Sequence, residues 1–155
     1  MADIGVPPPP PPPVAAAEPV ITQDERTMAV LAHALQMVGW FIAPLVILVV
    51  RRESRFVSFH ALQALLLQVT YVLLFVVFMV IWFAVMFGTI ARAGSMPNAQ
   101  PPPVIFAIFP LFWLAWMALW ILMIVAAIVY AIKAGRGEWA EYPLLGKLAR
   151  RLLGF

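Results

Sequence analysis

One tetrapeptide occurs twice in the chain and contains both of its histidines. Residues His33–Gln36 and His60–Gln63 both read His-Ala-Leu-Gln. A histidine and a glutamine three residues apart lie on one face of a helix. Beyond the second copy, that face continues with Gln68, Thr70 and Tyr71. Imidazole can bind a metal or exchange a proton near neutral pH, so this face is the first candidate for chemistry.

Geometry argues against a shared active site on this face. If the first two helices are antiparallel about a loop near Arg52, His33 and His60 are offset along the bundle by about 17 Å at about 1.5 Å per residue. Zinc requires ligand atoms within about 2.1 Å. The chain has no cysteine, and it lacks a phosphate-binding glycine loop, an HExxH motif and a nucleophile elbow. We therefore predict no enzyme and no catalytic, cofactor or metal residues.

We interpret the polar face as a set of interhelical hydrogen-bonding groups, with the lining of a path or binding site as the alternative. Polar side chains inside a membrane normally face the bundle interior or a water-filled cavity. The residues of this candidate face are His33, Gln36, His60, Gln63, Gln68 and Tyr71.

Charged residues are confined to short segments of the chain. It is 65% hydrophobic and only 11% charged, whereas a soluble domain is about a quarter charged. Three stretches contain no Asp, Glu, Lys or Arg, and they lie between Arg26 and Arg51, Arg55 and Arg92, and Arg92 and Lys133. A hydrocarbon core about 30 Å thick requires about 20 apolar residues of helix. The sequence therefore predicts an all-α integral membrane bundle over residues 22–155, with transmembrane helices at about 28–50, 64–88 and 106–132.

Prolines and glycines indicate where these helices bend or end. Pro44 predicts a kink in the first span; the alternative is a re-entrant hairpin bent at Pro44. The uncharged stretch 56–91 is too long for one span and too short for two, so it predicts a single helix over about 55–90. Pro110 predicts a bend in the third helix.

The two ends of the chain differ from this apolar middle. Residues 1–21 include seven consecutive prolines, Pro7–Pro13, which favour an extended rod in a disordered tail. We interpret the tail as a spacer; a ligand for a proline-recognition domain is the alternative.

The C-terminal segment has a helical period and predicts an amphipathic interfacial helix at about 143–153. Its apolar arc consists of Leu144, Leu145, Leu148, Leu152 and Phe155, and Lys147, Arg150 and Arg151 lie opposite. Such a helix favours anionic lipid headgroups, although it could instead dock on a partner. Trp139 and Tyr142 are expected in the aromatic belt beside it.

Lys and Arg predict the orientation. With three spans, the first loop and the C-terminal part share one side and hold eight of the ten Lys and Arg residues. The positive-inside rule makes this side cytoplasmic and places the tail outside; a re-entrant first segment would place the tail in the cytoplasm. The expected cytoplasmic anchor comprises Arg51, Arg52, Arg55, Lys147, Arg150 and Arg151.

An aromatic stripe follows one face of the third helix and consists of Phe106, Phe109, Trp113, Trp116 and Trp120. We interpret it as a packing or lipid-facing seam. A pocket for a lipid or another apolar ligand is the alternative.

Several of these segments together resemble a widespread bacterial membrane family of unknown function. They are Glu25-Arg26, Leu31–His33, Gly39, Pro44, Arg51–Val57, Phe59–Ala64, Gly137-Glu138 and Tyr142–Leu144. That family is similar to the twenty-kilodalton Tic subunit of the chloroplast inner-envelope preprotein translocon. The resemblance implies a channel or scaffold role in moving polypeptides across a membrane, and it supplies no catalytic residues.

The sequence thus leads to two functional hypotheses for a protein of the bacterial plasma membrane. The first is a non-enzymatic translocon-like or channel/scaffold component, which would need homo-oligomers or other membrane proteins to form a path. The second is a lipid-associated membrane-organising protein that acts through the basic C-terminal helix. The basic residues lie at membrane edges, so no nucleic-acid partner is expected.

Overall fold

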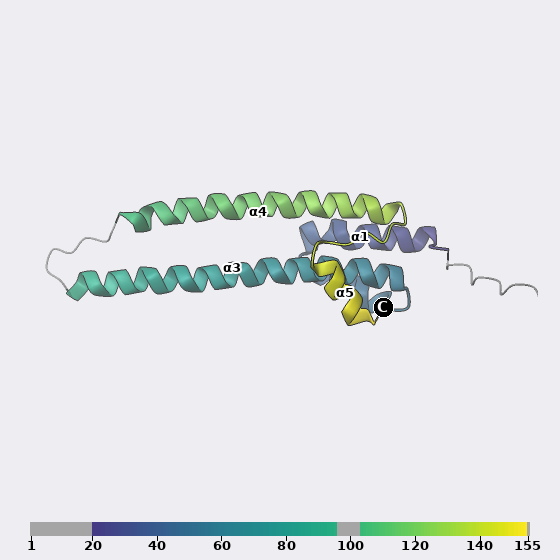
Figure 1. Cartoon of the computed structure of the whole chain (residues 1–155), viewed down its shortest axis with the longest axis horizontal. Coiled ribbons are helices and arrows are strands. Elements are labelled where there is room, and N and C mark those ends of the chain that lie inside the picture. Colours follow the sequence, from purple (N-terminus) through teal and green to yellow (C-terminus); the bar gives the residue numbers. More distant parts are fainter. Residues whose placement is uncertain (1–19, 96–102, 155) are drawn as a thin grey trace, which may run out of the picture.

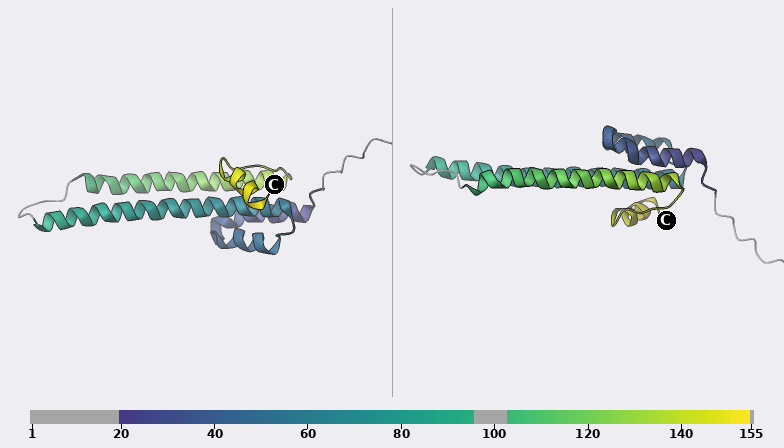
Figure 2. Two further views of the ribbon diagram at one scale, coloured as in Figure 1. Left: turned by 60° about the horizontal axis from the view of Figure 1, so that its bottom comes forward. Right: turned by 90° about the horizontal axis from the view of Figure 1, so that it is seen from above.

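The computed structural model describes residues 20–95 and 103–154, and over these residues its regular structure is entirely helical. Two long antiparallel helices dominate it (Figure 1). Three shorter helices gather around one end of that pair (Figure 2). In chain order the helices are α1 (Gln23–Gly39), α2 (Ile42–Val50), α3 (Arg55–Ser95), α4 (Val104–Gly135) and α5 (Leu145–Leu153).

The first apolar segment is a hairpin rather than a span, so the prediction of three transmembrane helices is wrong. Only α3 and residues Phe106–Gly135 of α4 are long and apolar enough, among the described residues, to cross a membrane. The chain reverses at Trp40, whose φ of 51° lies in the left-handed region. Gly39 permits the close approach, because a Cβ there would lie 2.8 Å from the Cβ of Ala43.

Pro44 is not the site of this reversal. It is the third residue of α2, where its missing N–H breaks no helical hydrogen bond. The two ends of the hairpin are joined at the same end of the molecule. Arg51 pairs with Asp24 at 2.9 Å, and the Ser54 hydroxyl donates to Glu25 at 2.7 Å. The start of α1 and the first loop therefore lie at the same end of the molecule, as in the re-entrant alternative. The tail itself, residues 1–19, lies outside the described residues.

The two long helices exceed the thickness of a hydrocarbon core. α3 has 41 residues and α4 has 32, or about 61 Å and 48 Å at about 1.5 Å per residue. The hydrocarbon region is about 30 Å thick, and about 45 Å with the headgroups. The pair must therefore tilt or project from the bilayer. The helix α3 was predicted to end at about residue 90, and it continues to Ser95.

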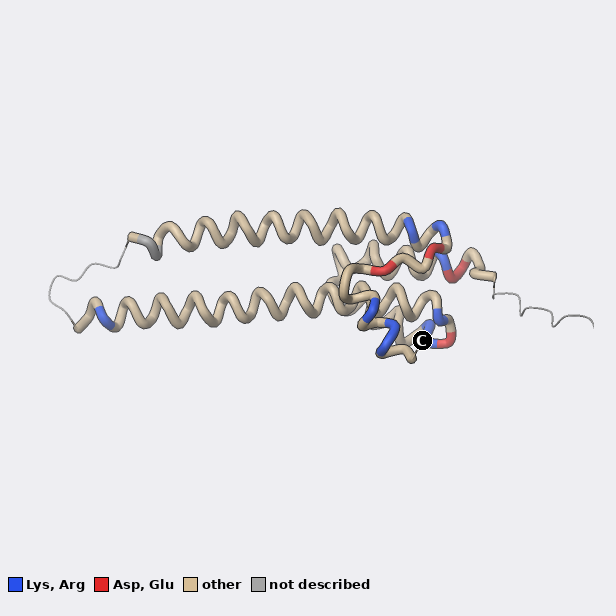
Figure 3. The backbone as a smooth tube through the Cα atoms, in the orientation of Figure 1, with Lys and Arg blue, Asp and Glu red and all other residues tan. Residues whose placement is uncertain are grey.

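The charges lie almost entirely at the end where the short helices gather (Figure 3). Of the ten Lys and Arg residues, Arg92 is at the far end and the other nine are at this charged end. The hairpin causes this concentration, since it returns Arg26 to the side of the first loop. The sequence-based division of eight against two therefore becomes nine against one.

The predicted C-terminal helix is present as α5, and it docks on α3 through small residues. Gly146 and Ala149 are buried, and Ala149 packs with Phe59 and Leu62. Its leucine arc faces away from the protein, with Leu144, Leu148 and Leu152 exposed. Phe155 and the polyproline tail over residues 1–19 lie outside the described residues.

Candidate functional site

The two histidines lie in direct contact, in contrast to the predicted axial offset of about 17 Å. His33 Nε2 is 3.1 Å from His60 Nδ1, and both side chains are fully buried. The offset was wrong because the chain reverses at Trp40 as well as at the loop near Arg52. As a result α1 and α3 both begin at the charged end and run in the same direction (Figure 1). The two His-Ala-Leu-Gln segments therefore lie on neighbouring parallel helices.

The surrounding acceptors determine where the protons of this pair lie. His60 Nε2 is 3.1 Å from the carbonyl oxygen of Glu138, and a carbonyl can only accept, so Nε2 of His60 carries the proton. In neutral His60, Nδ1 must then accept from His33 Nε2. His33 Nδ1 in turn accepts from the Tyr142 hydroxyl at 3.2 Å. The result is a one-way chain of hydrogen bonds, which uses all four ring nitrogens.

Tyr142 is the donor at the head of this chain, and the sequence did not reveal its role. The side chain was expected in the aromatic belt, but it is 4% exposed. Burial raises the pKa of the Tyr142 hydroxyl. The hydroxyl therefore stays protonated and can donate to His33. Its ring packs against Tyr130 with centroids 3.9 Å apart. The sequence signal was weak, because Tyr142-Pro143 is only a short motif next to a basic helix.

The irregular segment 138–142 is held by the polar face of α3. Gln63 donates through Nε2 to the carbonyl of Ala140 at 3.2 Å and accepts from the backbone N–H of Tyr142 at 2.7 Å. The Tyr130 hydroxyl donates to the carbonyl of Glu141 at 2.6 Å. Backbone groups outside regular structure need such partners when they are buried. The buried polar side chains thus fasten the α4–α5 connection to α1 and α3.

The hydrogen bonds of this arrangement hold α1, α3 and the α4–α5 connection together. Because every histidine ring nitrogen is engaged, a metal could bind only by breaking these hydrogen bonds. Among the described residues, no group of three or more His, Cys, Asp or Glu side chains could hold a metal ion.

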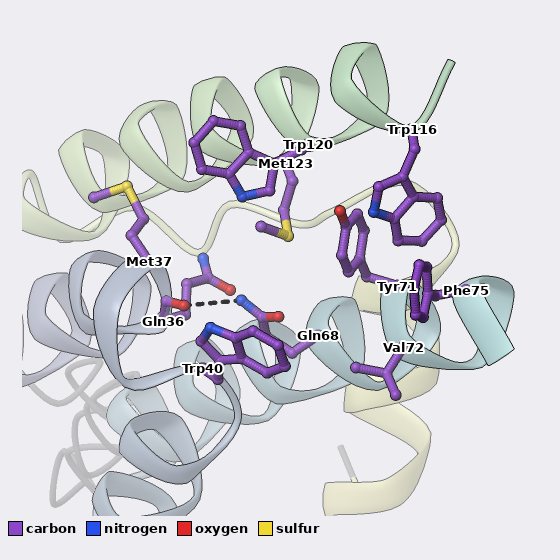
Figure 4. A pocket seen from close by; sticks show the side chains of 10 residues that line it. All are labelled: Gln36, Met37, Trp40, Gln68, Tyr71, Val72, Phe75, Trp116, Trp120 and Met123. Carbon is purple, nitrogen blue, oxygen red and sulfur yellow. Dashed lines mark hydrogen bonds between the residues drawn. The ribbon is translucent and has the colours of Figure 1, made fainter. Parts of the chain in front are cut away.

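The other members of the predicted polar face border a pocket between α1, α3 and α4 (Figure 4). Gln68 Nε2 donates to the backbone carbonyl of Gln36 at 2.9 Å. Tyr71 packs against Trp116 with centroids 4.2 Å apart. The pocket has a volume of about 270 Å³, and its lining consists of Gln36, Met37, Trp40, Gln68, Tyr71, Val72, Phe75, Trp116, Trp120 and Met123.

The predicted aromatic stripe divides between this pocket and the seam of the long helices. Phe109 packs against Trp82 of α3, and Trp116 packs against Phe75. Trp116 and Trp120 also line the pocket, whereas Phe106 is 71% exposed. The closest ring pair of the seam includes Phe112, which lies outside the predicted stripe and stacks on Phe78 at 3.3 Å.

The predicted anchor residues share the charged end but differ in their contacts. Arg51 pairs with Asp24, and Arg150 pairs with Glu141 and lies over the Phe59 ring. The remaining four, Arg52, Arg55, Lys147 and Arg151, have exposed side chains. At the same end, hydrogen bonds from Ser54 and from the Thr22 backbone hold the pKa of Glu25 below its usual value.

A model of the magnetosome magnetite crystal formation protein family (MamF_MmsF) matches residues 24–149 of the chain. The chain belongs to this family. The matched region contains both His-Ala-Leu-Gln segments and the first part of α5. The match shows no similarity to the Tic subunit. No curated protein and no solved structure matches the chain.

Proposed function

We propose that this protein is a non-enzymatic membrane-shaping component that stabilises a curved bilayer with its charged end in the convex leaflet. The magnetosome is a membrane compartment, and the role fits a member of a family named for crystal formation inside it. The proposal places the chain's contribution in the membrane rather than at the mineral.

The observation that carries the proposal is the unequal cross-section of the molecule. Near the charged end α1 packs on both α3 and α4, while α2 and α5 pack on α3. Toward the far end only α3 and α4 continue (Figures 1 and 2). A protein that occupies more area in one leaflet than in the other favours bending of the bilayer toward the narrower side.

The extra helices present apolar surface suited to acyl chains. On α2, Val46 and Val49 are 53% and 64% exposed. Leu144, which directly precedes α5, and Leu152 on α5 are 82% and 61% exposed. Burying such surface in lipid contributes about 25 cal/mol per Å², so both elements would stay inserted in the leaflet at the charged end.

The molecule is thus a wedge that is wide at the charged end, and its charges determine which end faces the cytoplasm. Nine Lys and Arg residues at one end favour the cytoplasmic side and its anionic lipids. The convex leaflet would then be the cytoplasmic one, as in a compartment that buds into the cell from the plasma membrane. No Asp or Glu occurs between Glu53 and Glu138, so the far end offers no carboxylate for an iron mineral.

The translocon-like role is a weaker alternative. A path through the protein would need open polar groups, but His33, His60 and Gln63 are fully buried. They bond to one another or to the α4–α5 connection. These contacts favour packing, the role that we first inferred for this polar face.

Curvature sorting tests the proposal. The purified full-length chain is reconstituted into giant vesicles containing anionic lipid, narrow tubes are drawn from them, and the protein density per membrane area is compared between tube and vesicle. Protein with its charged end on the outer, convex leaflet is expected to be enriched in the tube. Equal densities at all tube radii would overturn the proposal.

A matched pair of variants shows which end of the molecule causes the enrichment in the tube. The double variant Leu144→Ser/Leu152→Ser removes exposed apolar surface at the wide end, and its enrichment should fall. Leu111→Ser/Leu114→Ser makes the same change at two positions on α4 that are 63% and 65% exposed, and it should leave the enrichment unchanged. Equal loss in the two variants would show that general hydrophobicity, not the wedge, drives sorting.

A further inference from the structure

We propose that the pocket between α1, α3 and α4 binds a membrane-dissolved molecule with a ring-sized, hydroxyl-bearing head, of the phenol type. This site goes beyond the membrane-shaping role and does not depend on it. It rests on the aromatic side chains that line this partly open pocket and on one buried amide that has no partner.

The unpartnered group is the side-chain amide of Gln36. Gln36 is 1% exposed, and neither its Nε2 nor its Oε1 has a hydrogen-bond partner. The amide lies beside the Tyr142 hydroxyl without reaching hydrogen-bond geometry. In Figure 4 it extends toward the space between Gln68 and Trp120. A buried amide without a partner is costly, and the lipid around a membrane protein cannot supply one.

The lining of the pocket does not favour a charged lipid headgroup, because none of the described residues that form it is Lys, Arg, Asp or Glu. Gln68 is 13 residues beyond Arg55 in α3, or about 20 Å along the helix. A molecule suited to this uncharged pocket is neutral and largely apolar.

The walls define the chemistry of the ligand. An amide donates through Nε2 and accepts through Oε1, and a hydroxyl group can satisfy both. The indole rings of Trp40, Trp116 and Trp120 are suited to a flat ring. The volume of about 270 Å³ is at the lower limit for small-molecule sites. It suits one ring, with an apolar tail leaving between the helices.

Three ligands that differ only in one polar substituent test this site. Para-nonylphenol can donate and accept, para-nonylanisole can only accept, and nonylbenzene can do neither. Each is added at a set mole fraction to nanodiscs that contain the full-length protein, and its apparent dissociation constant is obtained from the rise in the unfolding temperature. Nonylphenol is expected to bind about tenfold more tightly than nonylbenzene, with the anisole between them.

The variant Gln36→Leu provides the control for partitioning into lipid. Its amide has no partner in the protein, so the free variant should be at least as stable as the wild type. The variant should bind all three compounds equally. Val72→Phe, which fills the pocket from α3, should weaken binding of all three.

Two outcomes would overturn the proposal. One is equal binding of nonylphenol and nonylbenzene by the wild type. The other is a preference for nonylphenol that persists in Gln36→Leu. Because the readout is ligand-dependent stability, failure here would leave the result of curvature sorting unaffected.

Discussion

Replacing His60 tests the directed hydrogen-bond chain that joins α1, α3 and the α4–α5 connection. The variant His60→Leu removes the acceptor for His33 Nε2–H and the donor for the Glu138 carbonyl. A buried donor left unpaired costs about 1–3 kcal/mol. The carbonyl bond is only partly buried, and its loss costs about 1 kcal/mol. The free energy of unfolding should therefore fall by about 2–4 kcal/mol.

His60→Asn separates these two contributions. Asparagine can place an oxygen near the position of His60 Nδ1, so it keeps the acceptor for His33 and loses only the bond to Glu138. Asparagine is smaller than histidine and leaves room in the core, whereas leucine has a volume similar to that of histidine. We expect His60→Asn to lose about 1 kcal/mol, clearly less than His60→Leu.

Reversible unfolding of the purified protein in mixed micelles, followed by circular dichroism, measures both values. The nitrogen chemical shifts of the two imidazoles supply an independent check, since both rings should carry their proton on Nε2. Equal losses for the two variants, or a loss below about 0.5 kcal/mol for His60→Leu, would refute the assigned proton positions and their energetic role.

Two other perturbations follow from close contacts near the charged end. Gly146→Ala places a Cβ 2.5 Å from the Cβ of Glu141 and 3.0 Å from Oε1 of Gln63 on α3. The helix α5 should therefore detach from α3, and protease cleavage near residue 145 should become faster than in wild type. Glu25 has a lowered pKa in the folded state, mainly through Ser54. Its stabilising effect is therefore complete above the unfolded pKa and is lost as pH falls through the folded pKa. Thermal unfolding between pH 6 and pH 3 should show a smaller acid-induced loss in Glu25→Gln than in wild type; identical losses would contradict this assignment.

The sequence predicted the long helices and missed the hairpin for a physical reason. Long stretches without charge can only be helices in lipid, so α3 and α4 were accessible from composition. In the first segment Pro44 was the evident helix breaker, whereas the chain turns at Trp40, after Gly39. A re-entrant pair of helices and a single kinked span have the same composition.

One signal in the sequence did favour the hairpin. Folding the first segment back moves Arg26 to the side of the first loop, which strengthens the asymmetry of Lys and Arg. The reversal at Trp40 also explains why the two histidines are in contact. His33 and His60 were both identified as candidates, but their contact depends on α1 running parallel to α3. The part played by Tyr142 depends on a long-range contact that no local pattern encodes.

The sidedness of the hairpin is the most direct test of the wedge. The natural chain has no cysteine, so single cysteines can be introduced at Gln23, Glu53 and Gly94, which are all exposed. Each variant is treated with a membrane-impermeant maleimide from either face of oriented membrane vesicles. Positions 23 and 53 should react from the same face and position 94 from the opposite one. Reaction of position 23 from the same face as position 94 would mean that the first segment spans the membrane, and it would contradict the wedge.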